Sequence, residues 1–296
     1  MISLMGCKTK EESQGAGKFG FEKIEPHHSN VTFSNDLTHD VTTKSNLFDF
    51  DYFYNGSGVA TIDVNNDDLP DLLFTANQVQ NRLYLNKGDF VFEDITEVSG
   101  INAGKQWSNG VTVVDINGDG SDDIYISQGG PYESGKRKNL LYINNGDLSF
   151  TERAESYGLA DQGISTQSAF FDYDRDGDLD CIVMNESTLY GHDPISFQRR
   201  VLERPKDYYE SFSHLYRNDG GKFVDVSKEA GITKPTFGLG LAISDINEDG
   251  YPDIYIANDY YLPDNLYINK KNGSFSDRIK THINHTSFFG MGSGYR

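Results

Sequence analysis

The chain has little cysteine, tryptophan or basic charge, and it has no long hydrophobic run. Its two cysteines, Cys7 and Cys181, are too few for a disulfide framework, and Cys181 suits a small core residue of a buried strand. No stretch approaches the ~20 apolar residues of a transmembrane helix. Lys and Arg total 26 against 45 Asp and Glu, a net charge of −19. This balance argues against nucleic acid or an anionic membrane surface as the main partner.

The motifs of common enzyme classes are also missing. The sequence contains no HExxH, GxSxG, Walker loop, GxGxxG or CxxC, and its seven histidines show no metal-ligand spacing. His27 and His28 are predicted to form an exposed turn pair. Glycosidases use two acids, but no acid pair stands out here once the repeated loops described next are set aside. We therefore expect a protein that is not an enzyme.

One acidic loop occurs four times. The copies read DVNNDDLPD (63–71), DINGDGSDD (115–123), DYDRDGDLD (172–180) and DINEDGYPD (245–253). Each has a carboxylate or amide oxygen at positions 1, 3, 5 and 9, and three have Gly at position 6, as in short loops that wrap oxygen ligands around calcium. The predicted ligands are Asp63, Asn65, Asp67, Asp71, Asp115, Asn117, Asp119, Asp123, Asp172, Asp174, Asp176, Asp180, Asp245, Asn247, Asp249 and Asp253.

An EF-hand would require a helix that brings a bidentate Glu to position 12. That position is instead Phe74, Ile126, Val183 or Ile256, each in a run of branched and aromatic residues that predicts a strand. The segments before the loops also read as strands. The alternative that these are ordinary Asp-Gly turns remains open, but crowding carboxylates into nine residues is repulsive without a cation. We expect about four calcium ions.

The loops start 52, 57 and 73 residues apart, and each is followed by a hairpin pattern of Leu-Tyr, an Asn-containing Gly turn, and Phe with an acidic residue. Four strands per repeat predict an all-β fold built from propeller blades. The combined pattern, clearest between residues 52 and 101, resembles the FG-GAP/VCBS repeat family and, within it, bacterial CRTAC1-like proteins that often carry an ASPIC/UnbV region. The resemblance covers about residues 21–296 and implies a seven-bladed propeller with calcium between the first two strands of a blade.

The chain is short for that family. It carries four complete loops and the start of a further repeat at 287–296, and residues 21–31 resemble an outer-strand pattern, so four to five blades are expected and a fragment of a longer protein is predicted. Residues 1–20 read as a tether. Leu4 to Cys7 resemble a lipobox, although only six residues precede Cys7, so lipid anchoring there and a chance match are both open.

Two further features, an insertion and the single tryptophan, could each either bind a partner or have a purely structural role. The insertion at 186–213 holds Arg199, Arg200, Arg204 and Lys206 with Tyr190, Tyr208 and Tyr209, and either binds an anionic partner or packs as a solvated loop. Trp107 either faces the propeller mouth or caps the core.

The function expected from these patterns is a calcium-binding, extracytoplasmic propeller segment, secreted or on the cell envelope, that serves as a binding or adhesion scaffold for a protein or glycan. The alternative is a non-catalytic substrate-binding domain of a larger envelope polysaccharide-processing enzyme. A reading frame with a catalytic domain downstream would favour the alternative.

Overall fold

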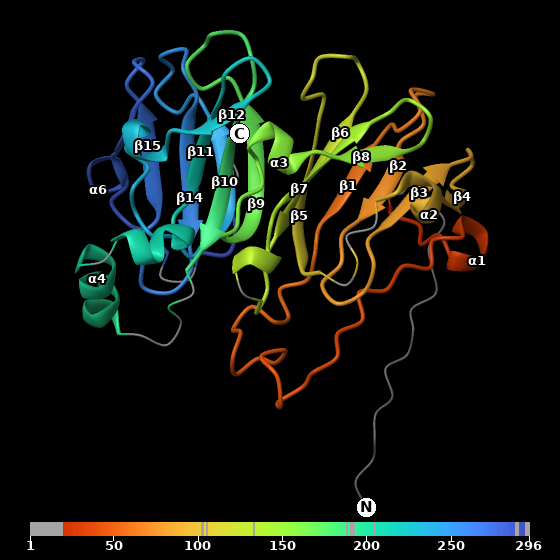
Figure 1. Cartoon of the computed structure of the whole chain (residues 1–296), viewed down its shortest axis with the longest axis horizontal. Coiled ribbons are helices and arrows are strands. Elements are labelled where there is room, and N and C mark those ends of the chain that lie inside the picture. The colour runs from red at the N-terminus through yellow and green to blue at the C-terminus, as the bar shows by residue number, and fades with distance from the viewer. Residues whose placement is uncertain are drawn as a thin grey trace, which may run out of the picture.

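The computed structural model describes residues 20–101, 104, 106–132, 134–187, 189, 193–203, 205–287 and 290–293. These residues form four antiparallel sheets of four strands, and in each sheet neighbouring strands are consecutive in the chain. The sheets stand side by side as blades (Figure 1). The predicted all-β architecture with four-stranded blades is confirmed.

The strands of the first two blades lie close to the residues that the sequence pattern predicts. They are β1 (Val59–Ile62), β2 (Asp71–Phe74), β3 (Arg82–Asn86) and β4 (Phe92–Asp94), then β5 (Ser108–Val114), β6 (Asp123–Gln128), β7 (Leu140–Asn144) and β8 (Phe150–Glu152). Each acidic loop joins the first and second strands of its blade, as predicted.

The third and fourth blades repeat this order. Their strands are β9 (Ile164–Phe171), β10 (Asp180–Glu186), β11 (His214–Asn218) and β12 (Phe223–Asp225), then β13 (Gly238–Ser244), β14 (Asp253–Asn258), β15 (Asn265–Asn269) and β16 (Phe275–Asp277). Inner strands of successive blades lie next to each other. The approach is close: a Cβ on Gly110 of β5 would lie 2.5 Å from the carbonyl oxygen of Thr166 in β9.

Apolar side chains fill the spaces between successive blades. One cluster joins blades one and two through residues such as Leu83 and Ile124, a second joins blades two and three, and a third joins blades three and four. Cys181 is a fully buried member of the second cluster and a free thiol, which confirms its predicted core role. Cys7 and the other residues of the predicted tether up to residue 19 lie outside the described residues, so lipid anchoring stays a prediction.

Short helices, which the strand pattern did not predict, follow the outer strands. They are α2 (Thr96–Ser99), α3 (Ala154–Tyr157), α5 (Ser227–Ala230) and α6 (Ile279–His282). The segment at 21–31, which resembles an outer strand and its following helix in sequence, forms only the helix, α1 (Pro26–Ser29). His27 and His28 are exposed on it. The expected outer strand is wrong there, because residues 21–25 have no regular secondary structure and pair with none of the described strands.

The insertion of the third blade is helical where a loop was expected. It forms α4 (Pro194–Glu203) and the 3₁₀ helix η2 (Pro205–Ser211). Phe197 and Val201 pack on Phe237, which supports the packed interpretation, while Arg199 and Arg200 remain exposed. Tyr190 and Arg204 lie outside the described residues, and the side chain of Lys206 is not described.

Residues 46–57, called the strap below, cross the end of the blades opposite the acidic loops (Figure 1). Tyr52 donates its hydroxyl to Asp259 over 3.1 Å, and Tyr260 donates to Asp51 over 2.6 Å. The strap therefore bridges from the start of blade one to blade four. Trp107 is 2% exposed and packs against strap residues, so it caps the core.

Candidate functional site

The four acidic loops share one backbone conformation. Position 1 in each accepts hydrogen bonds from the backbone N–H groups of positions 5 and 6; for Asp63 these come from Asp67 at 3.1 Å and Asp68 at 2.8 Å. The corresponding acceptors are Asp115, Asp172 and Asp245. Each loop is therefore wrapped around the side chain at position 1, the first of the predicted cation ligands.

Two residues of every loop have a left-handed backbone. Position 6 does so in all four copies, including Asp68, with φ 65°, in the copy that lacks Gly there. Position 4 is also left-handed, at Asn66, Gly118, Arg175 and Glu248. Non-Gly residues adopt this conformation at a cost in free energy, so the backbone is strained at position 4 of three loops. The sequence pattern did not reveal this strain.

Position 9 is a buried anchor. Asp180 is fully buried, and its Oδ2 accepts the N–H of Tyr173 at 3.1 Å while its Oδ1 accepts the N–H of Asn218 at 2.9 Å. Asp71, Asp123 and Asp253 are held in the same way. Each carboxylate oxygen has a second lone pair, so these residues can brace the loop and still contribute to a cation's shell.

An asparagine at the end of the third strand completes each loop. Its side-chain Nδ2 donates to the carbonyl of loop position 8, at 2.8 Å from Asn86 to Pro70 and at 3.2 Å from Asn218 to Leu179. Asn144 and Asn269 do the same. The Asn of the Leu-Tyr pattern is visible in the sequence, but the pattern alone does not reveal this role. Its recurrence after all four loops is the signal that would have revealed this contact.

The third loop fits a cation best. Oxygens of Asp172, Asp174 and Asp176 lie within 4.8 Å of one another. Oδ1 of Asp174 and Oδ1 of Asp178 are buried without a hydrogen-bond partner. Burial, followed by neighbouring carboxylates, raises the pKa of Asp174 and of Asp178. Burial likewise raises the pKa of Asp180 to about 7. A cluster of orphaned, mutually repelling oxygens has the donor chemistry that a hard divalent cation satisfies.

The other loops have asparagine at position 3 and a different local arrangement. Nδ2 of Asn65 donates to Asp67 over 2.9 Å, and Asn117 and Asn247 make the same contact with Asp119 and Asp249 at 2.8 and 3.0 Å. The amide must turn for its oxygen to face a cation. In all four loops the predicted residues at positions 1, 3 and 5 are partly or fully exposed, and the predicted residue at position 9 is buried.

Comparisons with known proteins agree with the repeat pattern. Residues 63–126, which run from the first acidic loop into β6, match the FG-GAP-like repeat model. Cartilage acidic protein 1 from Xenopus tropicalis is 24% identical over 261 residues, which cover 83% of this chain and 37% of that protein. The Mus musculus protein of the same name is 22% identical over 241 residues, which cover 81% of this chain and 34% of that protein. The chain therefore spans about a third of the length of these curated relatives.

Among solved structures, an Agrocybe aegerita lectin that recognises non-reducing terminal N-acetylglucosamine is similar to this chain. The two share 16% sequence identity with a TM-score of 0.37, over 73% of this chain and 49% of the lectin chain. Among the described residues, none of the helices has the length and apolar character needed to span a bilayer. Residues 63–126 thus match an FG-GAP-like repeat and the chain is similar to cartilage acidic protein 1, which confirms the resemblance that its sequence pattern indicated.

Proposed function

We propose that this protein is a calcium-binding β-propeller scaffold that acts outside the cytoplasm and presents a binding surface to a protein or glycan. The observation that carries the calcium assignment is the third loop, where three carboxylates converge and two buried oxygens lack partners. The proposal is non-catalytic, in keeping with the relationship to an FG-GAP-repeat family and with the missing catalytic motifs.

Calcium and location are linked in this proposal. Loops of this kind in extracellular modules bind calcium with dissociation constants on the order of 10⁻⁴ to 10⁻³ M, so they fill only where calcium is abundant. The net charge of −19 favours attraction of cations. In this scheme calcium neutralises the loop tips and fixes the blades, and the partner binds to a scaffold that is already rigid.

Calorimetric titration of the decalcified chain tests the calcium assignment. We expect about four ions to bind, with magnesium a poor competitor because it demands a smaller, octahedral shell. Asp174→Asn should remove or weaken one site. Asp147→Asn is the matched control, because Asp147 is an aspartate of a Gly-containing hairpin outside the loops, where it accepts hydrogen bonds from Ser149. Fewer than two ions, or equal binding of magnesium, would refute the assignment.

A further inference from the structure

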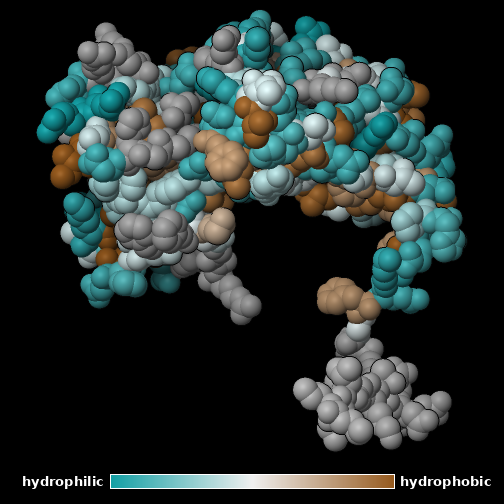
Figure 2. All heavy atoms as spheres, turned by 90° about the horizontal axis from the view of Figure 1, so that it is seen from below, coloured by the Kyte–Doolittle hydropathy of each residue, from teal (hydrophilic) through white to brown (hydrophobic). Residues whose placement is uncertain are grey.

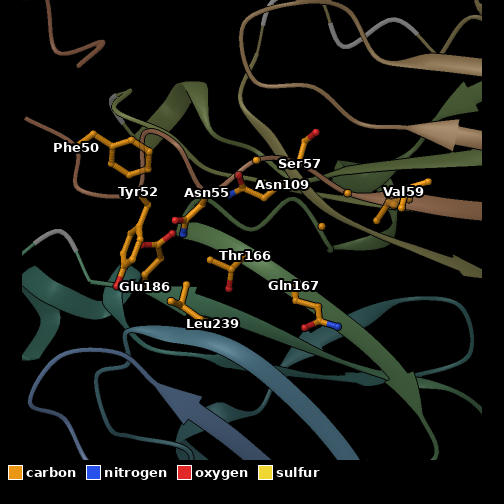
Figure 3. Close-up of a pocket in the computed structure, with 14 residues that line it drawn as sticks. Phe50, Tyr52, Asn55, Ser57, Val59, Asn109, Thr166, Gln167, Glu186 and Leu239 are labelled. Carbon is orange, nitrogen blue, oxygen red and sulfur yellow. The ribbon is translucent and has the colours of Figure 1, made fainter. Parts of the chain in front are cut away.

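A cavity of about 320 Å³ lies where the inner strands of the four blades begin, beneath the strap. Its walls come from the starts of β1, β5, β9 and β13 together with Phe50 and Tyr52 of the strap (Figure 3). None of the sixteen predicted calcium ligands lines it. Figure 2 views the molecule from this end and shows an arc-shaped outline with one concave side. The volume falls at the small end of the range for ligand pockets.

One end of the cavity combines a carboxylate with aromatic rings. Glu186, the last residue of β10, lines the cavity although it is only 1% exposed, and it lies beside Tyr52 and Asn55 (Figure 3). Its backbone is fixed by pairing with Ile164 and Phe237. Phe50 and Tyr52 pack edge to face with ring centroids 6.3 Å apart. A carboxylate held beside ring faces is the combination that recognises organic cations.

Two further carboxylates, Asp259 and Asp51, lie behind this wall. Tyr52 donates its hydroxyl to Asp259, and Tyr260 donates to Asp51. Burial, then the negative charges of Glu186 and Asp259, raise the pKa of Tyr52 far above its ordinary value, so the phenol stays neutral. The described carboxylates of Glu186, Asp259 and Asp51 at this end of the cavity disfavour an anionic ligand and favour a cationic one.

The part of the cavity lined by β5 and β9 offers hydrogen-bond acceptors. Asn109 uses Nδ2 to donate to the carbonyl of Ser165 over 2.7 Å, so its Oδ1 remains as the amide's acceptor. Thr166 donates its hydroxyl to the carbonyl of Gly238 over 2.8 Å, which leaves acceptor lone pairs on Oγ1. Gln167 of β9 is exposed at the same wall. A ligand that carries several N–H donors matches this wall.

We propose that this cavity binds a primary ammonium group, with the carboxylate of Glu186 as its counter-ion and the rings of Phe50 and Tyr52 around it. Ammonium has three donors and no acceptor, so it fits a wall rich in acceptors. The group can come from a lysine side chain of a protein partner or from an amino sugar. Both are compatible with a scaffold for protein or glycan, and the test separates them.

The full chain, saturated with calcium in 150 mM salt, is titrated by NMR or calorimetry with two probes. Nα-acetyl-lysine methylamide represents the protein source, and glucosamine represents the sugar source. Their matched controls are the Nε-acetylated lysine derivative and N-acetylglucosamine, which keep the size but lose the charge. Binding of one charged probe, with its acetylated control at least about tenfold weaker, supports the proposal and identifies the source, because a charged hydrogen bond is worth about 1.5 to 3 kcal/mol.

Two variants test the residues. Glu186→Gln should weaken the bound probe at least about tenfold. Because a buried change can perturb folding, Gln167→Lys provides an independent test: it puts a competing ammonium at an exposed position of the wall and should also abolish binding while leaving the melting temperature unchanged. Equal binding by the acetylated controls, unchanged binding by both variants, or no binding of either charged probe would overturn the proposal. Calcium stoichiometry is independent of these outcomes, so failure here is distinguishable from failure of the calcium assignment.

Discussion

Arg175 in the third acidic loop donates a hydrogen bond from Nη1 to the carbonyl oxygen of Gly250 in the fourth loop, over 2.6 Å. Its guanidinium also lies over the ring of Tyr251, 5.4 Å from the centroid. Asn66 makes the equivalent contact from the first loop to Gly120 of the second, at 3.4 Å. The second loop has Gly118 at this position and no side chain to reach the third. Loop position 4 therefore joins the loops in two pairs.

Removing the Arg175 contact should destabilise the protein even though it relieves backbone strain. In Arg175→Gly the lost hydrogen bond and ring contact, together about 1 to 2 kcal/mol, oppose a relief of about 1 kcal/mol at the left-handed position. Glu248→Gly is the matched control, because Glu248 has the same backbone conformation, with φ 57°, and is exposed. In urea unfolding with excess calcium, we expect Glu248→Gly to stabilise and Arg175→Gly to destabilise. If both variants changed the free energy of unfolding in the same direction, the contact from Arg175 to the fourth loop would not stabilise the protein.

The asparagines at the end of the third strands differ in burial and in the number of carbonyls they reach, so replacing them should lower the free energy of unfolding by different amounts. Asn269 is 3% exposed and donates Nδ2 to two carbonyls, Tyr173 at 2.8 Å and Pro252 at 3.2 Å. Asn269→Ala should lower the free energy of unfolding by about 2 to 3 kcal/mol, since it leaves buried acceptors unpaired. Asn86 is less buried and reaches only Pro70, so Asn86→Ala should cost about 1 kcal/mol. Equal costs in urea unfolding would show that the second carbonyl contributes nothing.

Asp68 is the one non-Gly residue at position 6 and has the left-handed conformation that Gly adopts freely. Asp68→Gly should raise the free energy of unfolding by about 1 kcal/mol and strengthen calcium binding at the first loop. Calorimetric titration of the variant and the parent chain measures the second effect. A weaker first site in the variant would mean that Asp68 itself supplies an oxygen to the ion.

The strands and loops could be predicted because their signals are local. Ile62 and Asp71 end and begin paired strands, and the repeat of that pattern fixed the blade boundaries. The strap could not be predicted, since Tyr52 and Asp259 meet across 207 residues with no periodic pattern. The helix α4 was missed because the insertion has no counterpart in the other repeats. For position 9 the sequence predicted a metal ligand but not a buried anchor of the loop, because an aspartate in either role looks the same in sequence.

A buried ion pair between blades two and three predicts a pH dependence. His214 and Asp161 are both buried, with Nδ1 and Oδ2 2.5 Å apart. Although burial alone would lower the pKa of His214, the carboxylate of Asp161 outweighs it and the pKa is raised above 6.5. Its stabilising contribution is therefore complete below pH 6.5 and is lost as pH rises through the raised pKa. His214 lowers the pKa of Asp161 against the opposing effect of burial, so that contribution persists above pH 3.8 and fades as pH falls through the lowered pKa.

Urea unfolding at a series of pH values, with calcium saturating, measures this dependence. His214→Gln removes the titrating group, so its unfolding free energy should change less than that of the parent chain as pH rises above 6.5. A variant whose pH profile above that point parallels the parent would show that the pair does not control stability there.

Thermal unfolding with and without a calcium chelator is the most direct test of the central claim. If calcium binds the folded loops and barely binds the unfolded chain, mass action requires a higher melting temperature with calcium; at a hundredfold excess over the dissociation constant, each site adds about 2.7 kcal/mol. Asp172→Ala, which removes one of the converging carboxylates of the third loop, should shrink the difference. We predict that the chelator lowers the melting temperature by several degrees or more. An unchanged melting temperature would mean that the four loops are ordinary turns and that the calcium assignment is wrong.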